Sequence, residues 1–298
     1  MSLPLPSELI LALQAKIDAA CDPTVNHHIP GVVSIVVDSH GAEKFAYASG
    51  TRGVGSGIPM DVDSIFWIAS CTKLITSIAC LQLVEEGLID LDDVSSLEAL
   101  LPELKDVQVL EKEGDSGAFR LVPKERRISL RMLLSHTAGF SYSFFHEALR
   151  DFSRPVGFDE FSGHISDIIL QPLVHQPGDK WEYGVSYDWA GMLVERLRKQ
   201  SLGEYFKERI FAPLGITDMS FFPSGSMKDR LTTEEVKECF NSGGGGLFAK
   251  PGDFCKILST LLNNGLSPQT GHRILEDKSI NELFTNQIPN SQISAVKA

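Results

Sequence analysis

The sequence of 298 residues predicts an α+β fold, and two features carry this prediction. Two β-rich runs lie near the N-terminus, within residues 31–50, on either side of the turn signal at residues 38–41. The chain that follows, from about 68 to 265, has mainly helical patterns. Strands that come first, with helices after them, are typical of α+β chains.

The first expected elements are a helix over residues 7–20 and a hairpin over residues 31–50. Leu9, Leu13 and Ile17 fall on one face of the helix. Two strands alone make a marginal sheet, so the hairpin needs further strands beside it and helices on top. No convincing partner strand occurs before residue 298.

The helical region opens with FWIASCTKLITSIACLQLVEEG at residues 66–87, which is apolar nearly all round and ends at Gly87, a natural C′ residue. Segment 105–128 is the most polar and is expected to lie at the surface. No internal repeat or linker interrupts the chain, so we expect a single domain over 1–298. Four more helices are expected, at 129–140 up to Gly139, at 185–201 with Ser186 as N-cap, at 203–216 and around 251–263.

Composition excludes several function classes. The chain has 27 Lys and Arg against 39 Asp and Glu, a formal charge of −12, which disfavours nucleic acid and membrane partners. Its five cysteines are an odd number without CxxC spacing, which favours neither a disulfide framework nor a zinc site. The N-terminal apolar run is broken by polar residues and reads as an amphipathic helix, not a signal peptide. We therefore expect a cytoplasmic protein.

Ser70 and Lys73 form a candidate nucleophile and base. Residues i and i+3 share a helix face, so the hydroxyl and the amine should lie together at the start of the helix. A serine hydroxyl is a poor nucleophile until a base takes its proton, and burial makes a lysine easier to deprotonate. The alternative is a lysine whose amine reaches out to solvent from a helix start. The Ser-x-x-Lys pattern alone is weak, and it recurs at Ser294 and Lys297, where we expect no function.

The order of several segments makes the sequence similar to a family, the serine β-lactamase and penicillin-binding-protein-like hydrolases. The closer likeness is to class C-type esterases and to fungal acyltransferases of the lovastatin type, over residues 30 to 265. The segments are IPGVVSIVV, IFWIASCTKLITSIACLQLVEEGLIDLDD, ISLRMLLSHTAGF, HQPGDKWEYGVSYDWAGMLVERL, IFAPLGITDMSF and GGGGLFAKPGDFCKIL.

The resemblance implies an antiparallel sheet flanked by helices and three catalytic residues. Ser70 would be the acylated nucleophile, Lys73 its base, and Tyr183 the residue that relays the proton to the leaving group. No residue is predicted for substrate binding, and no metal or organic cofactor is expected. The run of glycines at 243–246 is expected to allow close backbone approach beside the site.

The implied activity is that of a serine hydrolase or acyltransferase acting on small-molecule esters or thioesters, in secondary metabolism. The expected partners are a small-molecule acyl donor and acceptor, with an acyl-carrier protein among the candidate donors. Val185 stands two residues after Tyr183, where β-lactamases of this type usually have asparagine, and this argues against antibiotic substrates. The alternatives are a β-lactamase or D-aminopeptidase, and a non-catalytic homologue.

One family motif has no counterpart in the chain. It is a late strand with a Lys/His-Thr-Gly or Trp-Gly-Gly segment that supplies the second oxyanion donor. We expect this strand and the rest of the sheet to lie beyond residue 298, so that the chain is truncated at its C-terminus relative to the family; the alternative is that a different ending replaces them.

Overall fold

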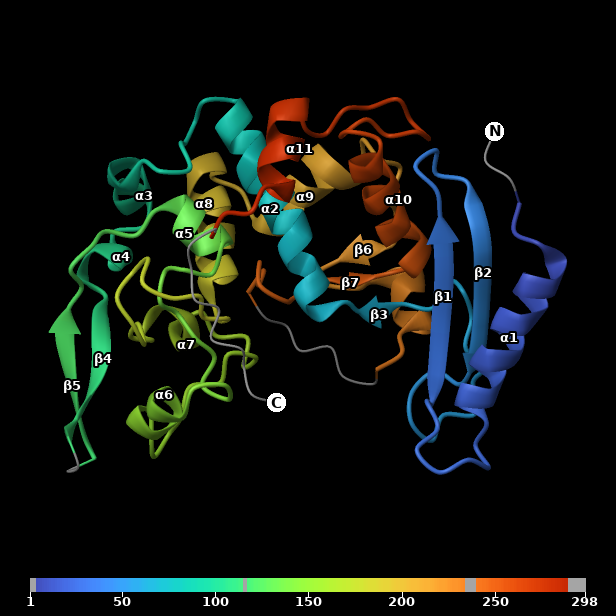
Figure 1. Cartoon of the computed structure of the whole chain (residues 1–298), viewed down its shortest axis with the longest axis horizontal. Helices are drawn as coiled ribbons and strands as arrows, with labels where there is room; N and C mark the ends of the chain where they lie inside the picture. The colour runs from blue at the N-terminus through green and yellow to red at the C-terminus, as the bar shows by residue number, and fades with distance from the viewer. Residues whose placement is uncertain (1–3, 115–116, 234–239, 289–298) are drawn as a thin grey trace. The chain divides into compact units, whose positions relative to one another are not determined.

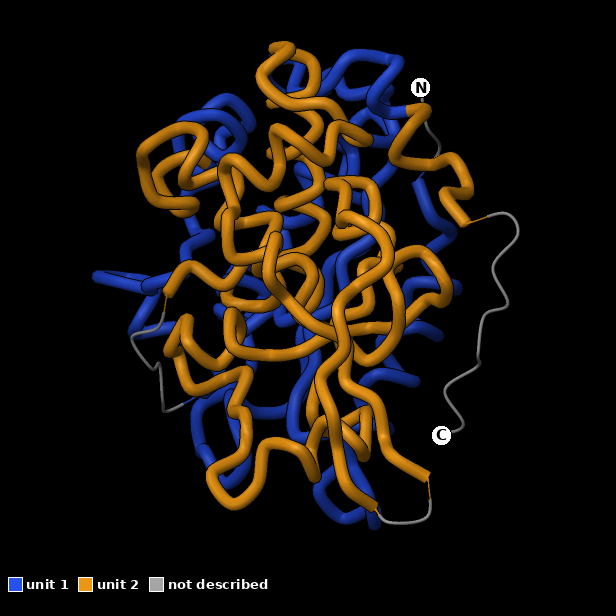
Figure 2. The backbone as a smooth tube through the Cα atoms, turned by 90° about the vertical axis from the view of Figure 1, so that its left-hand side faces the viewer, with its two compact units in different colours: residues 1–69, 206–237, 247–280 blue, residues 70–205, 238–246, 281–298 orange. Residues whose placement is uncertain are grey.

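The computed structural model describes residues 4–114, 117–233 and 240–288 and has the predicted α+β fold, with antiparallel sheets and helices (Figure 1). The chain divides into two compact units, each assembled from segments far apart in the sequence (Figure 2). Unit 1 comprises residues 1–69, 206–237 and 247–280, and unit 2 comprises residues 70–205, 238–246 and 281–298. The organisation as one domain over 1–298 stays a prediction.

Unit 1 is built around the predicted hairpin. Strands β1 (Gly31–Val37) and β2 (Glu43–Gly50) pair antiparallel from Gly31 opposite Gly50 onwards. Helix α1 (Ser7–Cys21) packs along β2, and helix α10 (Pro251–Leu262) packs along β1 (Figure 1). The two helices thus cover the β-rich runs, as the sequence predicts for an isolated hairpin.

A second, small sheet completes unit 1. Its strands run in the order β3 (Phe66–Trp67), β7 (Phe248–Ala249) and β6 (Met219–Ser220), all antiparallel. Buried Ile65, Met227 and Phe248 form a cluster at this sheet. The region also holds a π-helical stretch, Lys207–Phe211, and a 3₁₀ helix, Gly225–Arg230.

Unit 2 is mainly helical. Helix α2 (Thr72–Glu85) packs against α8 (Ser186–Arg198), and α8 also contacts α5 (Leu130–Leu134) and α3 (Val94–Leu100). The centre holds fully buried Trp189, whose ring stacks on Phe140 with centroids 5.6 Å apart. The short helices of the unit are α4 (Glu103–Asp106), α6 (Glu147–Phe152) and α7 (Ser166–Ile169).

Two helices each contain one of the points at which the chain passes from one unit to the other. Helix α9 (Leu202–Phe206) continues into the π-helical stretch, and α11 (Asp277–Phe284) begins in unit 1 and ends in unit 2. No helix within the described residues combines the length and apolar character needed to span a bilayer.

Several expected helices differ from the structure at their ends. The segment 66–87, expected as one helix, begins with strand β3 at Phe66–Trp67, and its helix α2 begins only at Thr72. The helix predicted over 129–140 is α5 alone, because His136 has φ 57° and Gly139 has φ 102°, both outside the helical range. Ser186 was expected as the N-cap of α8, but the N-cap is Val185, which makes no side-chain cap hydrogen bond.

The polar segment 105–128 contains a hairpin that the sequence analysis missed. Strands β4 (Gln108–Glu113) and β5 (Ala118–Pro123) pair antiparallel. Glu111 lies opposite Arg120 and their side chains form an ion pair at 2.6 Å. Opposite charges across a strand pair stabilise a hairpin whose apolar alternation is weak.

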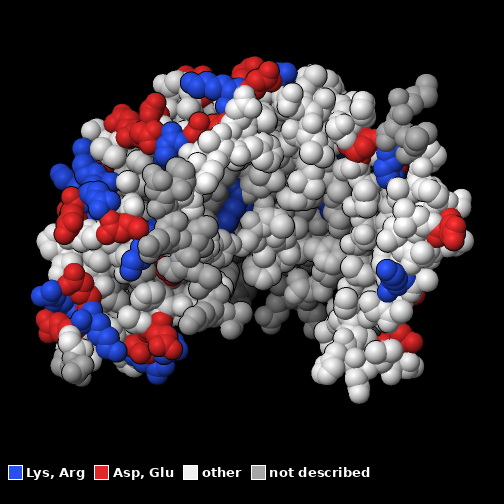
Figure 3. All heavy atoms as spheres, in the orientation of Figure 1, with Lys and Arg blue, Asp and Glu red and all other residues white. Residues whose placement is uncertain are grey.

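Charges of both signs are interspersed over the face formed by α3, α4, β4 and β5 (Figure 3). Ion pairs there join Arg127 to Glu98 and Arg196 to Glu103, both at 2.6 Å. This face therefore carries no continuous patch of one sign.

Candidate active site

Ser70 lies directly before helix α2, in unit 2. Eleven of the fourteen residues of α2 are buried, whereas Ser70 itself is exposed. The preceding residue, Ala69, has φ 44°, which is unusual for a residue other than glycine. Backbone strain of this kind clusters at functional sites. The local fold thus presents a serine hydroxyl at the start of a buried helix.

Lys73 points back toward Ser70 from the first turn of α2. Its side chain is 8% exposed, which excludes the alternative of an amine extended into solvent. Nζ lies 3.2 Å from Ser70 Oγ, 2.6 Å from the Gly244 carbonyl oxygen and 3.4 Å from the Tyr142 hydroxyl. A lysine has three N–H donors when protonated, and these three oxygens match them.

Tyr183 reaches the same hydroxyl from the loop before α8. Its phenol group donates a hydrogen bond to Ser70 Oγ at 2.6 Å. The next residue, Gly184, is required there: a Cβ would lie 2.4 Å from Ser141 Cα and 2.6 Å from the Phe140 carbonyl oxygen. This close backbone approach sets the position of the Tyr183 loop.

The three predicted site residues therefore meet at one point. Ser70 Oγ lies within hydrogen-bond distance of both Lys73 Nζ and Tyr183 OH. The Lys73 nitrogen also lies 4.7 Å from the centroid of the Tyr183 ring. Their catalytic roles stay predictions.

The glycine run approaches the site as the sequence predicts. The Gly243 carbonyl oxygen accepts a hydrogen bond from Thr76 Oγ1 at 2.8 Å, and the Gly244 carbonyl oxygen accepts one from Lys73. A Cβ at Gly244 would lie 2.6 Å from Asp188 Oδ2. The prediction of close backbone approach is thus confirmed.

Sequence reasoning missed Asp188, which lies in the first turn of α8. The carboxylate is buried and accepts hydrogen bonds from Ser242 Oγ at 2.6 Å and from the Gly244 N–H at 3.1 Å. Burial raises the pKa of Asp188, and the two hydrogen bonds and Lys73 oppose that effect. Its only sequence signal is an acidic residue inside an otherwise apolar helix start.

A second missed residue is Tyr142. Its hydroxyl lies near the Lys73 nitrogen, and burial, the largest cause, raises its pKa above the usual range. The phenol therefore stays neutral. The loop after Tyr142 is held by buried Glu160, which accepts hydrogen bonds from the Ser143 N–H at 2.6 Å and Oγ at 3.0 Å.

Three partly exposed phenylalanine rings lie near Tyr142 and Tyr183. The ring of Tyr142 stacks on the rings of Phe144 and Phe161, with centroids 4.9 Å and 6.1 Å apart. The ring centroids of Phe145 and Tyr183 are 6.3 Å apart. These three phenylalanines are each about half exposed. Apolar rings are therefore open to solvent beside the hydroxyl groups of the site.

The ring of His136 packs against the ring of Tyr183. Its buried imidazole lies 4.7 Å from the Tyr183 ring and 5.1 Å from the Tyr187 ring. Burial first, and then the charge of Lys73, lower the pKa of His136 to about 3. A neutral imidazole is therefore packed against two tyrosines.

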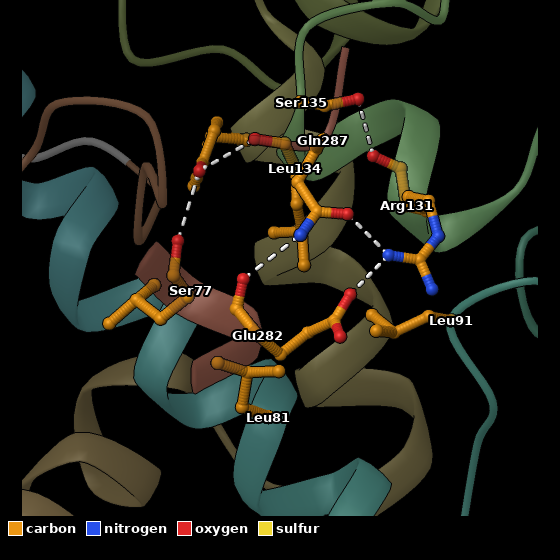
Figure 4. A pocket seen from close by; sticks show the side chains of 10 residues that line it. Ser77, Leu81, Leu91, Arg131, Leu134, Ser135, Glu282 and Gln287 are labelled. Atoms are coloured by element: carbon orange, nitrogen blue, oxygen red, sulfur yellow. Dashed lines mark hydrogen bonds and ion pairs between the residues drawn. The ribbon is translucent and has the colours of Figure 1, made fainter. Parts of the chain in front are cut away.

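Tyr187 is one of the residues that line a cavity of about 120 Å³ (Figure 4). Its hydroxyl lies 2.9 Å from Ser77 Oγ and donates to the Leu134 carbonyl oxygen at 2.9 Å. In this cavity Arg131 contacts Glu282, and it also pairs with Asp92 at 2.8 Å. The cavity is lined by none of the three predicted catalytic residues.

The described part of the chain contains no group of three or more His, Cys, Asp and Glu side chains placed to hold a metal ion. The functional groups within hydrogen-bond distance of the Ser70 hydroxyl are the Lys73 amine and the Tyr183 phenol.

The sequence matches known proteins over most of its length. The Beta-lactamase family model matches residues 13–291. The chain is 36% identical over 301 residues to a monacolin J acid methylbutanoyltransferase of Aspergillus terreus, covering 85% of this chain and 70% of that protein. It is also 36% identical over 263 residues to a lovastatin esterase of Penicillium rubens, covering 79% of this chain and 65% of the esterase.

Solved structures show the same fold. The unliganded simvastatin synthase of Aspergillus terreus superposes with a TM-score of 0.76 at 32% identity, covering 91% of this chain and 70% of that one. The hydrolase EstCE1, which has promiscuous acyltransferase activity, superposes with a TM-score of 0.68 at 20% identity, covering 92% of this chain and 75% of its own. The second likeness is one of fold alone.

Proposed function

The chain belongs to the beta-lactamase family, and we propose that it is a serine hydrolase or acyltransferase acting on small-molecule esters or thioesters. One observation carries this proposal: Ser70 Oγ lies 3.2 Å from a buried amine and 2.6 Å from a phenol hydroxyl. A nucleophile within hydrogen-bond distance of a base is the arrangement that covalent catalysis requires.

In the first half of the reaction, Ser70 Oγ attacks the carbonyl carbon of the substrate, and unprotonated Lys73 takes the hydroxyl proton. The oxyanion that forms is stabilised by the Ser70 backbone N–H and by a second donor that we do not assign. When the carbon–leaving-group bond breaks, Tyr183 gives its proton to the leaving oxygen or sulfur. Lys73 then returns a proton to Tyr183, and the acyl group remains on Ser70.

In the second half, water or an alcohol attacks the acyl-serine. The same groups act in reverse, since the incoming hydroxyl loses a proton and Ser70 regains one. Water as acceptor gives hydrolysis, and an alcohol gives acyl transfer. Neither half requires a metal or organic cofactor.

The relatives and the surroundings of the site favour apolar esters. One relative is named a methylbutanoyltransferase and another a lovastatin esterase, so we propose a short acyl group and a small-molecule acceptor of secondary metabolism. Phe144, Phe145 and Phe161 provide half-exposed aromatic surface beside the reacting groups. An acyl-carrier protein thioester is the second donor to test.

Val185 argues against the alternative of a β-lactamase. This side chain is completely buried and carries no amide, so the position offers no polar group to an antibiotic side chain. Turnover of nitrocefin would favour the alternative.

The proposal is tested with p-nitrophenyl esters of short fatty acids. Wild-type protein should release nitrophenol well above background, and Ser70→Ala should reduce the rate to background. Cys71→Ala is the matched control, because this exposed thiol is the neighbour of Ser70 and can react with active esters on its own. If Ser70→Ala retains the wild-type rate, the chain is not a serine acyl enzyme.

A further inference from the structure

The buried carboxylate of Asp188 has no role in the steps above, yet two hydrogen bonds connect it to the segment that contacts Lys73. Asp188 is 3% exposed, and burying a carboxylate is costly unless its oxygens are hydrogen-bonded. Both bonds, from Ser242 Oγ at 2.6 Å and from the Gly244 N–H at 3.1 Å, reach Oδ1 from one short segment. The carboxylate thus holds residues 242–244 against α8.

The opposite side of the same segment is bonded to α2. The carbonyl oxygen of Gly243 accepts from Thr76, and that of Gly244 accepts from Lys73. No side chain fits between the two helices here, since a Cβ at Gly243 would lie 2.7 Å from the Tyr187 carbonyl oxygen. Residues 242–244 therefore form a bridge from Asp188 to the amine at the site.

The contact of Gly244 with Lys73 is the shortest of the three that the amine makes, at 2.6 Å. A lysine side chain is flexible and has a high rotamer entropy, so a fixed acceptor is needed to hold its nitrogen in one place. Among the described residues Asp188 and Lys73 form no direct ion pair, so the hydrogen-bonded route from Asp188 to the amine runs through Gly244.

We propose that Asp188 is a positioning residue for acyl transfer: it fixes the bridge of residues 242–244, whose Gly244 carbonyl oxygen holds the Lys73 amine beside the Ser70 hydroxyl. The proposal rests on the function proposed above. It also explains the run of glycines: because these residues have no side chains, the Gly244 carbonyl group can lie between α2 and α8.

The test compares Asp188→Ala, Asp188→Asn and a matched control, Glu195→Ala. Glu195 is a second carboxylate on α8 that also contacts this part of the chain, through Asn241 at 3.3 Å, but it makes no bond to residues 242–244. The measured quantities are the rate constant of Ser70 acylation, by intact mass in a single turnover, and KM. Thermal unfolding confirms that each variant is folded.

Asp188→Ala should slow acylation by about 100-fold with little change in KM, since a misplacement of about 1 Å at a reacting group costs that much. Asp188→Asn retains an oxygen acceptor for Ser242 and Gly244 and should restore most of the rate. Glu195→Ala should stay within about threefold of wild type. An Asp188→Ala variant as fast as wild type, or a Glu195→Ala variant as slow as Asp188→Ala, would overturn the proposal.

A second readout does not depend on activity. Reductive methylation of Lys73, followed by peptide mass spectrometry, should be slow in wild type and in Glu195→Ala and several-fold faster once Asp188 is removed. If wild type forms no acyl-enzyme, the proposed function fails, while this labelling still decides whether Asp188 holds the amine. If Asp188→Ala does not fold, Ser242→Ala removes one of the two bonds, and unchanged labelling and acylation in that variant would contradict the positioning role.

Discussion

Acidification is expected to destabilise the fold through one buried side chain, His136. The imidazole is 7% exposed and packs against Tyr183 and Tyr187, and its Nδ1 has no hydrogen-bond partner among the described residues. Burial and the charge of Lys73 lower its pKa from 6.5 to about 3. The folded protein therefore keeps this ring neutral at pH values at which the unfolded chain protonates it.

The sign and size of the effect follow from that difference. Between the two pKa values the unfolded state binds more protons, so the free energy of unfolding falls as the pH drops below 6.5 and continues to fall to about 3. The limiting loss is roughly 5 kcal/mol, at about 1.4 kcal/mol for each pH unit. Over the step from about pH 7 to about pH 5, protonation of the unfolded chain alone removes about 2 kcal/mol.

Urea unfolding of wild type and His136→Asn at both pH values measures this loss. Asparagine suits the site because it tolerates the positive φ of 57° at this residue. Burial also raises the pKa of Asp188 and lowers that of His146, so both proteins change with pH, and only their difference isolates His136. Wild type should lose about 2 kcal/mol more than the variant on acidification. Equal losses would show that burial does not hold this imidazole neutral and would refute the reasoning.

Three further predictions concern the site and its surroundings. Lys73→Met should lower kcat for p-nitrophenyl esters by roughly 10²–10⁴-fold while the protein stays folded, as expected for loss of a general base; a rate near that of wild type would exclude lysine as the base. Gly184→Ala should cost about 1–3 kcal/mol of stability in chemical denaturation, because its Cβ would overlap the backbone of Ser141; unchanged stability would mean that the loop is free to shift. Ellman's reagent should modify exposed Cys71 quickly in native protein and leave Cys80 unreacted, because burial raises the pKa of the Cys80 thiol to about 12; equal rates would contradict the burial of Cys80.

Local patterns in the sequence predicted the elements that carry the site. The β-rich runs gave the hairpin of unit 1, and the apolar segment ending at Gly87 gave α2. The spacing of Ser70 and Lys73 was enough to place their side chains together, because the contact is made within one helical turn. Tyr183 came from the family resemblance and not from any local pattern.

Local sequence patterns could not predict contacts between residues that are far apart in the sequence. Asp188 and Gly244 are 56 residues apart, and Lys73 and Gly244 are 171 residues apart, so no spacing rule joins them. The hairpin within 105–128 was missed because its strands do not alternate apolar with polar residues: the buried residues Val109 and Leu110 are adjacent. The helix over 129–140 was predicted to be longer than it is, because the residue type of His136 gives no sign of its positive φ. The cytoplasmic location stays a prediction.

The central claim is that Ser70 becomes acylated, and mapping the acyl group tests it most directly. Cys71→Ala protein is incubated with an activated short-chain ester, so that no thiol adjoins the serine, and the adduct is located by intact mass and peptide mass spectrometry. The account predicts one added acyl group on the peptide that contains Ser70, with none in the Ser70→Ala, Cys71→Ala double variant. Ester turnover that leaves this peptide unmodified, or an adduct that persists in the double variant, would contradict it.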